Sequence, residues 1–308
     1  METEINPTPT MRAVVDIGRK CNMKCRFCYY VHENLEGFKK IDDIKREIDA
    51  AFDRGYNYID FTGGEPMMHP DLAESIIHLK AKSMRCCVIT NGTAGKEATN
   101  KALKAGVDEF LVSVHGASEE THDKLTSLPG SRKMQERFLG QVFMDSPVLR
   151  INCVIKHWNQ DEVPEIAAFM LKWSPKIVNF INLNPHHAWK NDTKRTAESI
   201  ADLRVAEKGL NKAVEMLEDA GVGVNVRYWP MCPIAPEYRR SICNDFHVAF
   251  DPYEWDYDIK PKTFEAFKTW SLNLSCGTEW KANPCIICDL RNACGGVIDA
   301  FFKAQRES

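Results

Sequence analysis

The sequence predicts an α/β protein in which repeated strand–helix units surround a parallel sheet, followed by a cysteine-rich segment without such units. Two observations predict this class. Short apolar runs rich in β-branched residues alternate with longer stretches of helical period as far as about residue 185. Beyond that point clean periodic runs are few, although six of the twelve cysteines lie there. The first part is therefore expected to fold around an apolar core of strands and helices, and the second part is not.

Six strands are expected, each a short apolar run bounded by turn residues. They cover Arg12–Ile17, Tyr58–Thr62, Arg85–Thr90, Glu109–Val114, Leu149–Lys156 and Ile177–Leu183. The helices between them cover Asp42–Arg54, Pro70–Ala81, Lys96–Ala105, Arg132–Asp145 and Glu162–Trp173. Gly106 is placed to end the third helix, because glycine accepts the left-handed turn after a helix. Periodicity alone leaves both a partial (β/α)6 barrel and a doubly wound sheet open.

A domain boundary is expected near residue 195, so that residues 1–195 form the barrel and residues 196–308 form a C-terminal extension. The extension begins with a long helix over about Ala197–Ala220 and a strand over Gly223–Tyr228. It continues as a stretch dense in Pro, Trp, Tyr and Cys. Because this stretch has little apolar patterning, we expect bound metal to order it.

Composition and charge exclude several functional classes. The net charge of -3 gives no general attraction to polyanions, so a nucleic-acid partner is not expected. No apolar run is long enough to span a membrane, and the N-terminus lacks the features of a secretory signal. A cytoplasmic location is therefore expected. In a reducing compartment, closely spaced cysteines indicate metal ligands rather than disulfides.

The first such group is Cys21, Cys25 and Cys28, which follow the first expected strand. Active sites of parallel sheets lie at the carboxyl ends of the strands. Three thiolates can hold three corners of a 4Fe-4S cubane and leave the fourth iron open to another ligand. A structural zinc site and a fully ligated ferredoxin cluster each use four protein ligands, so the spacing favours neither. A small zinc knuckle is the alternative.

Polar motifs also end the next strands. Gly63, Gly64, Glu65 and Pro66 follow the second strand, where paired glycines allow a close backbone approach to a ligand and Glu65 offers a carboxylate to an ammonium group. Taken alone, these four residues would form only a tight turn. Asn91 lies in a Thr-Asn-Gly triplet after the third strand, and Ser113 lies at the end of the fourth.

Together, these motifs resemble the signature of the radical S-adenosylmethionine (SAM) superfamily. The resemblance covers approximately residues 12–185 and implies a partial (β/α)6 barrel. It also implies that SAM chelates the open iron of a 4Fe-4S cluster on Cys21, Cys25 and Cys28. The reduced cluster then cleaves SAM to methionine and a 5'-deoxyadenosyl radical, with electrons from an external donor such as flavodoxin or ferredoxin.

The resemblance also implies which residues bind SAM. Those residues are Gly63, Gly64, Glu65, Pro66, Asn91, Ser113, Asn152 and Val154. Glu65 would hold the amino group of SAM, Ser113 the ribose or carboxylate, and Asn152 and Val154 would lie near the ribose and adenine. His115 departs from the pattern, which has aspartate at this position, and no catalytic role is assigned to it.

The C-terminal cysteines resemble part of a SPASM or twitch extension, which holds auxiliary iron-sulfur clusters in some members of the superfamily. One auxiliary cluster is expected, on Cys276, Cys285, Cys288 and Cys294. Cys232 or Cys243 could replace Cys276, and a four-cysteine zinc site is the alternative. Two complete clusters are not expected, because Ile298 stands where the full pattern has a further cysteine.

These motifs do not specify the substrate, because specificity lies in the divergent loops. A small metabolite or a peptide is expected, with the small substrate or a separately supplied peptide carrier favoured because the first strand begins about a dozen residues into the chain. Residues 228–230 and 251–256, which are aromatic and acidic, could line the pocket, and His186 and His187 could contact substrate. A non-catalytic iron-sulfur or zinc protein that keeps the barrel as a scaffold or electron carrier is the other function class.

Overall fold

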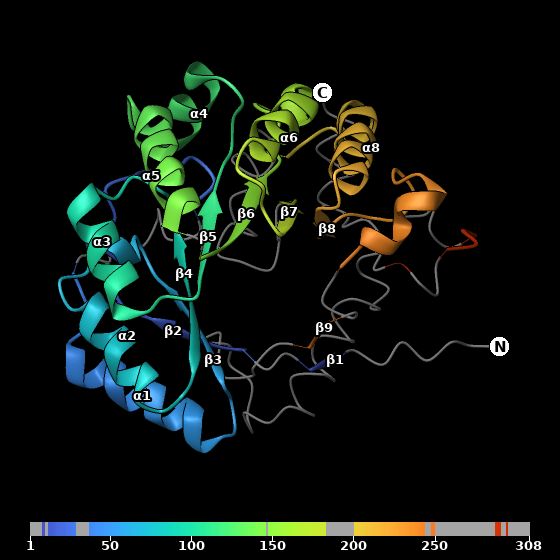
Figure 1. Cartoon of the computed structure of the whole chain (residues 1–308). Helices are drawn as coiled ribbons and strands as arrows, with labels where there is room; N and C mark the ends of the chain where they lie inside the picture. Colours follow the sequence, from blue (N-terminus) through green and yellow to red (C-terminus); the bar gives the residue numbers. More distant parts are fainter. Residues whose placement is uncertain are drawn as a thin grey trace. The chain divides into compact units, whose positions relative to one another are not determined.

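The structure is a computed structural model, and it describes residues 8–9, 12–28, 37–145, 147–182, 200–243, 248–249, 287–290 and 294. A seven-stranded sheet has the order β2-β3-β4-β5-β6-β7-β8 (Figure 1). Its strands are β2 (Arg12–Asp16), β3 (Tyr58–Thr62), β4 (Arg85–Thr90), β5 (Glu109–Ser113), β6 (Val148–Val154), β7 (Ile177–Ile181) and β8 (Gly223–Arg227). Neighbouring strands pair in parallel from β2 to β6. This arrangement confirms the predicted partial barrel.

The sheet has one strand more than the sequence predicted. β8 was expected as a separate strand of the C-terminal extension, but it belongs to the same sheet, next to β7. The backbone N–H of Asn182 donates to the carbonyl of Arg227 at 3.0 Å, and the Val226 side chain is fully buried. A further pair of short parallel strands, β1 (Thr8–Pro9) and β9 (Val248–Ala249), forms a second sheet.

Helices follow the strands as the repeated units require. They are α1 (Ile41–Asp53), α2 (Leu72–Lys80), α3 (Lys96–Ala105), α4 (Glu119–Thr126), α5 (Ser131–Asp145), α6 (Val163–Leu171) and α8 (Leu203–Asp219). Three short 3-10 helices are η2 (Pro66–Met68), η3 (Gln160–Glu162) and η5 (Pro236–Ser241). Gly106 ends α3 with a φ of +93°, as predicted.

Helix α4 was not predicted from the sequence. It is short, and it buries only His122, Leu125 and Thr126, so it lacks an apolar stripe of helical period. Ser118 begins it by accepting a hydrogen bond from the Thr121 N–H at 3.1 Å. Local polar contacts therefore define this helix, and such contacts leave a weak signal in the hydrophobic pattern.

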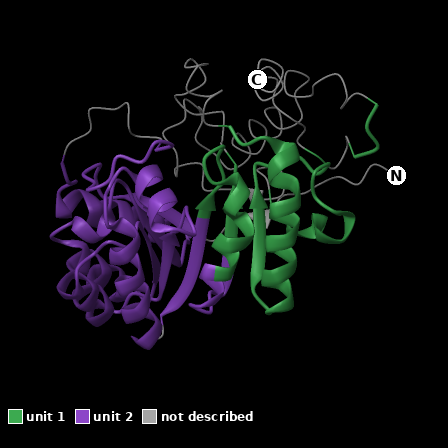
Figure 2. Cartoon of the chain, turned by 90° about the horizontal axis from the view of Figure 1, so that it is seen from above, with its two compact units in different colours: residues 1–10, 153–168, 179–308 green, residues 11–152, 169–178 purple. Residues whose placement is uncertain are grey.

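The chain divides into two compact units (Figure 2). One comprises residues 11–152 and 169–178, and the other comprises residues 1–10, 153–168 and 179–308. The unit of residues 11–152 and 169–178, purple in Figure 2, holds β2 to β5 and helices α1 to α5, together with every residue predicted to bind SAM except Val154. The predicted boundary near residue 195 lies outside the described residues and stays a prediction.

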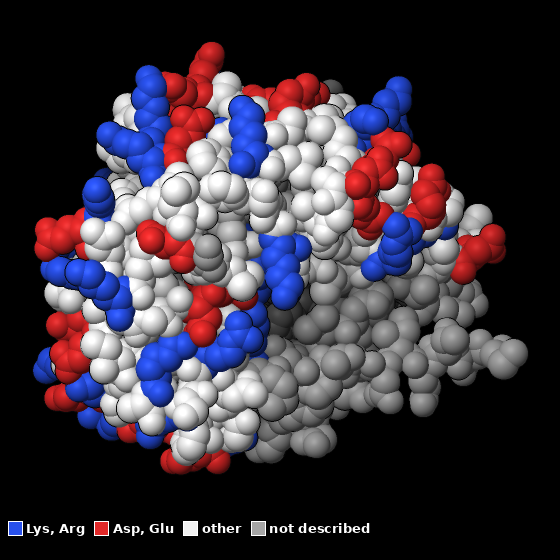
Figure 3. Space-filling model, viewed as in Figure 1, with Lys and Arg blue, Asp and Glu red and all other residues white. Residues whose placement is uncertain are grey.

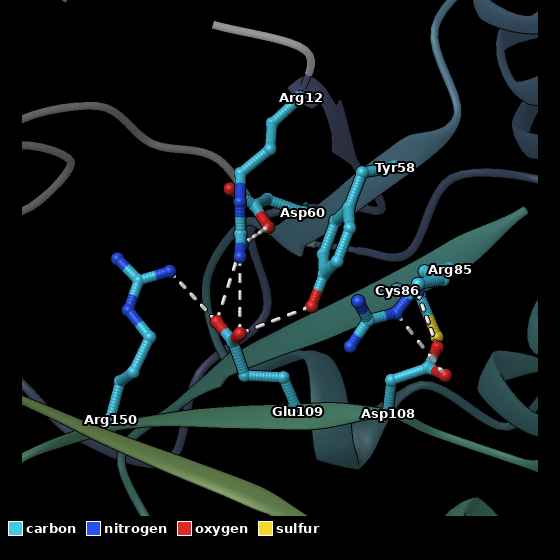
Figure 4. A network of polar contacts seen from close by, with 8 residues as sticks. All are labelled: Arg12, Tyr58, Asp60, Arg85, Cys86, Asp108, Glu109 and Arg150. Atoms are coloured by element: carbon cyan, nitrogen blue, oxygen red, sulfur yellow. Dashed lines mark hydrogen bonds and ion pairs between the residues drawn. The ribbon is translucent and has the colours of Figure 1, made fainter. Parts of the chain in front are cut away.

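An ionic network crosses one face of the sheet near the amino ends of the strands (Figure 4). Strand register places Asp60, Cys87 and Glu109 in one row on β3, β4 and β5. Arg12 bridges this row, with Nη1 2.8 Å from Asp60 Oδ1 and Nη2 3.1 Å from Glu109 Oε2. Arg150 Nη1 lies 2.8 Å from Glu109 Oε1. Two guanidinium groups and two carboxylates thus balance one another at the end of the barrel away from the predicted SAM site.

The surface carries both signs of charge. On the face shown in Figure 3, acidic and basic side chains are interspersed rather than gathered into a patch of one sign. Within the described ranges, no helix combines the length and apolar character needed to cross a membrane.

Candidate functional site

The cysteine loop, residues 17–28, follows β2 at its carboxyl end. It turns tightly, since the Cys28 N–H donates to the Cys25 carbonyl at 3.0 Å and the Met23 N–H donates to Cys21 Sγ at 3.3 Å. Cys21 is exposed, whereas Cys25 and Cys28 are half-buried. All three predicted ligands therefore lie on one compact turn.

The surroundings of these thiols disfavour negative charge. Burial raises the pKa of Cys21 to about 11. Burial raises the pKa of Cys25 well above its ordinary value, and the neighbouring charges of Cys28 and Cys21 add to this shift. Without a cation Cys21 and Cys25 therefore hold their protons at neutral pH, so cluster binding must release these protons and supply the compensating positive charge.

Within the described residues, no group of three or more His, Cys, Asp or Glu side chains gathers around a site for a single metal ion. A cubane differs from such a site, because each of its three cysteines binds a different iron. The cysteine loop offers three thiols and no carboxylate. Thiolates are the ligands that iron-sulfur clusters prefer, so these residues fit such a cluster.

The paired glycines after β3 let two backbone segments meet. The Gly64 N–H donates to the Gly18 carbonyl at 2.8 Å, and the Glu65 N–H donates to the Lys20 carbonyl at 2.9 Å. A Cβ at Gly63 or Gly64 would collide with the carbonyl oxygens of residues 18–20, and Gly63 has a φ of +141°. The expected close approach is therefore made to the cysteine loop itself, immediately before Cys21.

Glu65 is buried and accepts three hydrogen bonds from the protein. Its Oε1 accepts from the Met67 N–H at 2.9 Å and from the Thr90 hydroxyl at 2.6 Å, and its Oε2 accepts from the Asn91 N–H at 2.7 Å. Burial raises the pKa of Glu65, and these hydrogen bonds oppose the shift. Glu65 thus caps η2, which begins at Pro66, and ties it to the carboxyl end of β4.

Asn91 connects β4 to the cysteine loop. Its Nδ2 donates to Asn22 Oδ1 at 2.9 Å and lies 3.9 Å from Cys21 Sγ. Asn22 in turn donates to the Thr93 hydroxyl at 2.8 Å. The predicted SAM-binding residues after β3 and β4 therefore contact the cysteine loop: Gly64 and Glu65 just before Cys21, and Asn91 at Asn22 and Cys21.

Gln135, which the sequence did not indicate, connects the carboxyl ends of β4 and β5. Gln135, fully buried on α5, donates from Nε2 to the carbonyls of Asn91 at 3.0 Å and Ser113 at 2.8 Å. The Asn152 carbonyl accepts from the Val114 N–H at 2.8 Å. The structure thus brings together every predicted SAM-binding residue from Gly63 to Asn152. Val154, half-buried at the end of β6, belongs to the other unit.

Comparison with known families identifies this arrangement. The model of the Radical SAM superfamily matches residues 15–170, about half of the chain, and includes every element of the site just described. The chain belongs to the radical SAM superfamily. Its members are enzymes, so the expectation of an enzyme is confirmed.

Sequence relatives within the radical SAM superfamily act on different molecules. A probable GTP 3',8-cyclase of Thermococcus kodakarensis is 26% identical over 166 residues, which are 53% of this chain and 54% of that protein. An AdoMet-dependent heme synthase of Nitratidesulfovibrio vulgaris is 30% identical over 163 residues, covering 52% of this chain and 44% of that protein. The chain thus spans about half the length of the curated relatives it matches.

Solved radical SAM structures share the fold. Streptococcus suis SuiB bound to S-adenosylmethionine matches with a TM-score of 0.64 at 15% identity, over 96% of this chain and 73% of that one. Native anSMEcpe with bound AdoMet and a peptide matches with a TM-score of 0.64 at 16% identity, over 97% of this chain and 96% of that one. At these identities the likeness shows the fold alone.

The predicted auxiliary ligands are only partly described. Cys276 and Cys285 lie outside the described residues, as do His186 and His187. Cys288 and Cys294 are half-buried, and the Met231 N–H donates to Cys294 Sγ at 3.3 Å. That contact brings the residue next to Cys232 against one of the predicted ligands.

Glu65→Gln is expected to lower the unfolding free energy of the metal-free, SAM-free protein by about 1–3 kcal/mol. A glutamine has one acceptor oxygen, so in either orientation its NH2 group faces a backbone N–H, that of Met67 or that of Asn91. Chemical denaturation without SAM measures this change. Glu97→Gln, on an 84% exposed side chain, is the matched control. An unchanged stability of Glu65→Gln would contradict the capping role.

Proposed function

We propose that this chain cleaves SAM reductively at a 4Fe-4S cluster on Cys21, Cys25 and Cys28. The resulting 5'-deoxyadenosyl radical abstracts hydrogen from a small metabolite or a peptide. The observation that supports this most directly is the interlocking of the cysteine loop with the Gly-Gly-Glu-Pro turn and with Asn91, at the carboxyl ends of three neighbouring strands. When bound, the cluster supplies the electron that breaks a carbon–sulfur bond of SAM.

Contacts among the chain's own residues support a position for SAM. Cys21 Sγ lies 3.9 Å from the Asn91 side-chain amide, so SAM at the open iron would be next to the end of β4. Glu65 keeps a lone pair beyond its three protein hydrogen bonds, and its charge favours the ammonium group of SAM. Ser113 and Asn152 continue the proposed binding edge along β5 and β6, and Val154 stays a predicted SAM contact. Electrons would come from an external donor such as flavodoxin or ferredoxin.

Wild-type protein, reconstituted anaerobically with iron and sulfide and given SAM and dithionite, is expected to release 5'-deoxyadenosine. This assay separates the proposal from a non-catalytic iron-sulfur or zinc protein, which would release none. An iron-loaded protein that leaves SAM intact would contradict the proposal.

The substrate class rests on similarity. One relative is a probable GTP 3',8-cyclase, and the SuiB neighbour is bound to the precursor peptide SuiA in one structure. Both a small metabolite and a peptide therefore stay within the proposal. Product analysis with deuterated candidate substrates would show which one transfers deuterium to 5'-deoxyadenosine.

We further propose one auxiliary iron-sulfur cluster on Cys285, Cys288 and Cys294 with a fourth cysteine. Cys276 was the sequence-based choice for the fourth ligand. The contact between Met231 and Cys294 Sγ supports Cys232 as the alternative, because Cys232 is the next residue along the chain. A zinc ion on the same thiolates would order the same segment.

Replacing Cys21, Cys25 and Cys28 together by Ala is expected to leave about four irons per chain, because only the auxiliary cluster remains. Metal analysis with Mössbauer spectroscopy measures this. Adding Cys232→Ala, Cys243→Ala or Cys276→Ala to the triple variant identifies the fourth ligand, because only the addition that removes it loses iron. About one zinc per chain and no iron would show that the site is a structural zinc site and not a cluster. A protein without metal would contradict both the auxiliary cluster and the zinc site.

A further inference from the structure

The cysteine loop is bound to the end of α4, the helix that the sequence did not predict. The Lys24 N–H donates to the Thr126 carbonyl at 3.2 Å, and the Arg26 N–H donates to the Leu125 carbonyl at 2.9 Å. The last carbonyls of a helix have no partners within the helix, so they require donors from elsewhere. The loop supplies these donors from two residues that lie between its cysteines.

A ring contact holds the same loop from the strand side. Phe27, next to Cys28, meets the His115 ring edge-on, with ring centroids 4.5 Å apart. His115 is 4% exposed and follows the end of β5. Edge-to-face packing of this kind is directional, so it fixes the orientation of Phe27 as well as its position.

His115 is itself held against α4. Its N–H donates to His122 Nδ1 at 3.3 Å. Burial lowers the pKa of His122 to about 4, and the charge of Arg132 adds to this, so the ring is neutral at pH 7. The hydrogen bond from the His115 backbone assigns the lone pair to Nδ1. Gly116 allows the approach, since a Cβ there would meet the His122 backbone N at 2.5 Å. The segment after β5 that contains His115 and Gly116 therefore packs against both α4 and the cysteine loop.

We infer that His115 is a positioning residue for the cluster, whose ring fixes Phe27 and thereby the Cys25–Cys28 part of the loop against α4. The family pattern has aspartate here, and aspartate has no ring to offer. Because the contact uses the ring edge, a phenylalanine at position 115 should replace the histidine. The role for a cluster rests on the proposed function, whereas the effect on the loop does not.

The first test uses the metal-free full chain and hydrogen exchange of the loop amides. In His115→Ala, exchange at Lys24 and Arg26 is expected to be about three- to tenfold faster than in the wild type, the range that loss of one edge-to-face pair allows. His115→Phe should stay within about twofold of the wild type. His78→Ala, on α2 and paired with Asp49, is the control and should leave the loop unchanged. If His115→Ala speeds exchange throughout the unit, Phe27→Leu replaces it as the test variant. It should also speed exchange at Lys24 and Arg26 about three- to tenfold.

The second test uses the iron-loaded protein. His115→Ala should lose iron to a chelator about three- to tenfold faster than the wild type and change the EPR spectrum of the reduced, SAM-bound cluster, while His115→Phe restores both. The inference would be overturned if His115→Ala exchanged its loop amides and released iron at the same rates as the wild type. A His115→Phe protein as impaired as His115→Ala would also overturn it, because the ring would then not be the cause. A wild type without iron at Cys21, Cys25 and Cys28 would overturn the proposed function, while the exchange result would still decide the loop contact.

Discussion

The Cys25→Ala protein is expected to release at least about 100-fold less 5'-deoxyadenosine than the wild type after identical reconstitution. Residues that only support a metal ligand typically contribute 10–100-fold to affinity or activity, so loss of a ligand should cost more. Cys25 is the half-buried central thiol of the loop, and its pKa is raised by burial and then by the charges of Cys28 and Cys21. Removing it leaves an iron without its thiolate in a place that water does not readily fill.

Cys86→Ala is the matched control for this experiment. Cys86 is also a buried thiol, but it lies on β4 with its backbone N–H bonded to Asp108, away from the cysteine loop. It should keep the wild-type iron content and 5'-deoxyadenosine release. A Cys25→Ala protein that released 5'-deoxyadenosine at the wild-type rate would contradict the role proposed for the cysteine loop.

The strands and most helices could be predicted because burial dictates their residue types. Tyr58–Thr62, Arg85–Thr90 and Lys96–Ala105 match the observed bounds of β3, β4 and α3. Helix α4 could not be predicted, because its stability comes from caps and polar contacts rather than from an apolar stripe. Asp123 on α4, for example, accepts from the Arg132 N–H at 2.9 Å and so ties α4 to the start of α5.

The position of the site could be predicted, but the partners of its residues could not. Each motif follows a strand, and parallel strands bring their carboxyl ends to one edge. Glu65 was expected to face SAM, yet nothing local in the sequence indicates that it also accepts from Thr90 and Asn91. Gln135 gives no signal at all, because its two acceptors are backbone carbonyls of distant residues. Such contacts depend on tertiary packing, which one sequence does not record.

The Glu109→Gln protein is expected to lose about 3 kcal/mol of unfolding free energy. Glu109 accepts from both Nη atoms of Arg12, from Arg150 and from the Tyr58 hydroxyl (Figure 4). Glutamine keeps the shape but removes the charge and turns one acceptor into a donor that faces these groups. Breaking a buried ion pair costs about 3–5 kcal/mol, and the lower end applies because the Arg12 side chain is 28% exposed.

The pH dependence of stability should change with the same substitution. Burial alone would raise the pKa of Glu109, but the hydrogen bond from Arg12 and the charges of Arg150 and Arg12 outweigh it and hold the pKa below its ordinary value of 4.5. The ionised carboxylate therefore stabilises the folded state at pH values above 4.5, and this contribution is lost as the pH falls through the lowered pKa. Glu109→Gln should remove this part of the acid sensitivity.

A double-mutant cycle with Arg150→Met shows whether the loss comes from the ion pairs. Removing Glu109 alone leaves two guanidinium groups facing one carboxylate, that of Asp60, whereas removing Arg150 as well restores the balance between Arg12 and Asp60. The double variant is therefore expected to be more stable than the sum of the two single losses predicts, by about 1–3 kcal/mol. Additive losses would contradict an ionic coupling between Glu109 and Arg150. The loss in Glu109→Gln would then come from the contacts of Glu109 with Arg12 and the Tyr58 hydroxyl, which the cycle leaves in place.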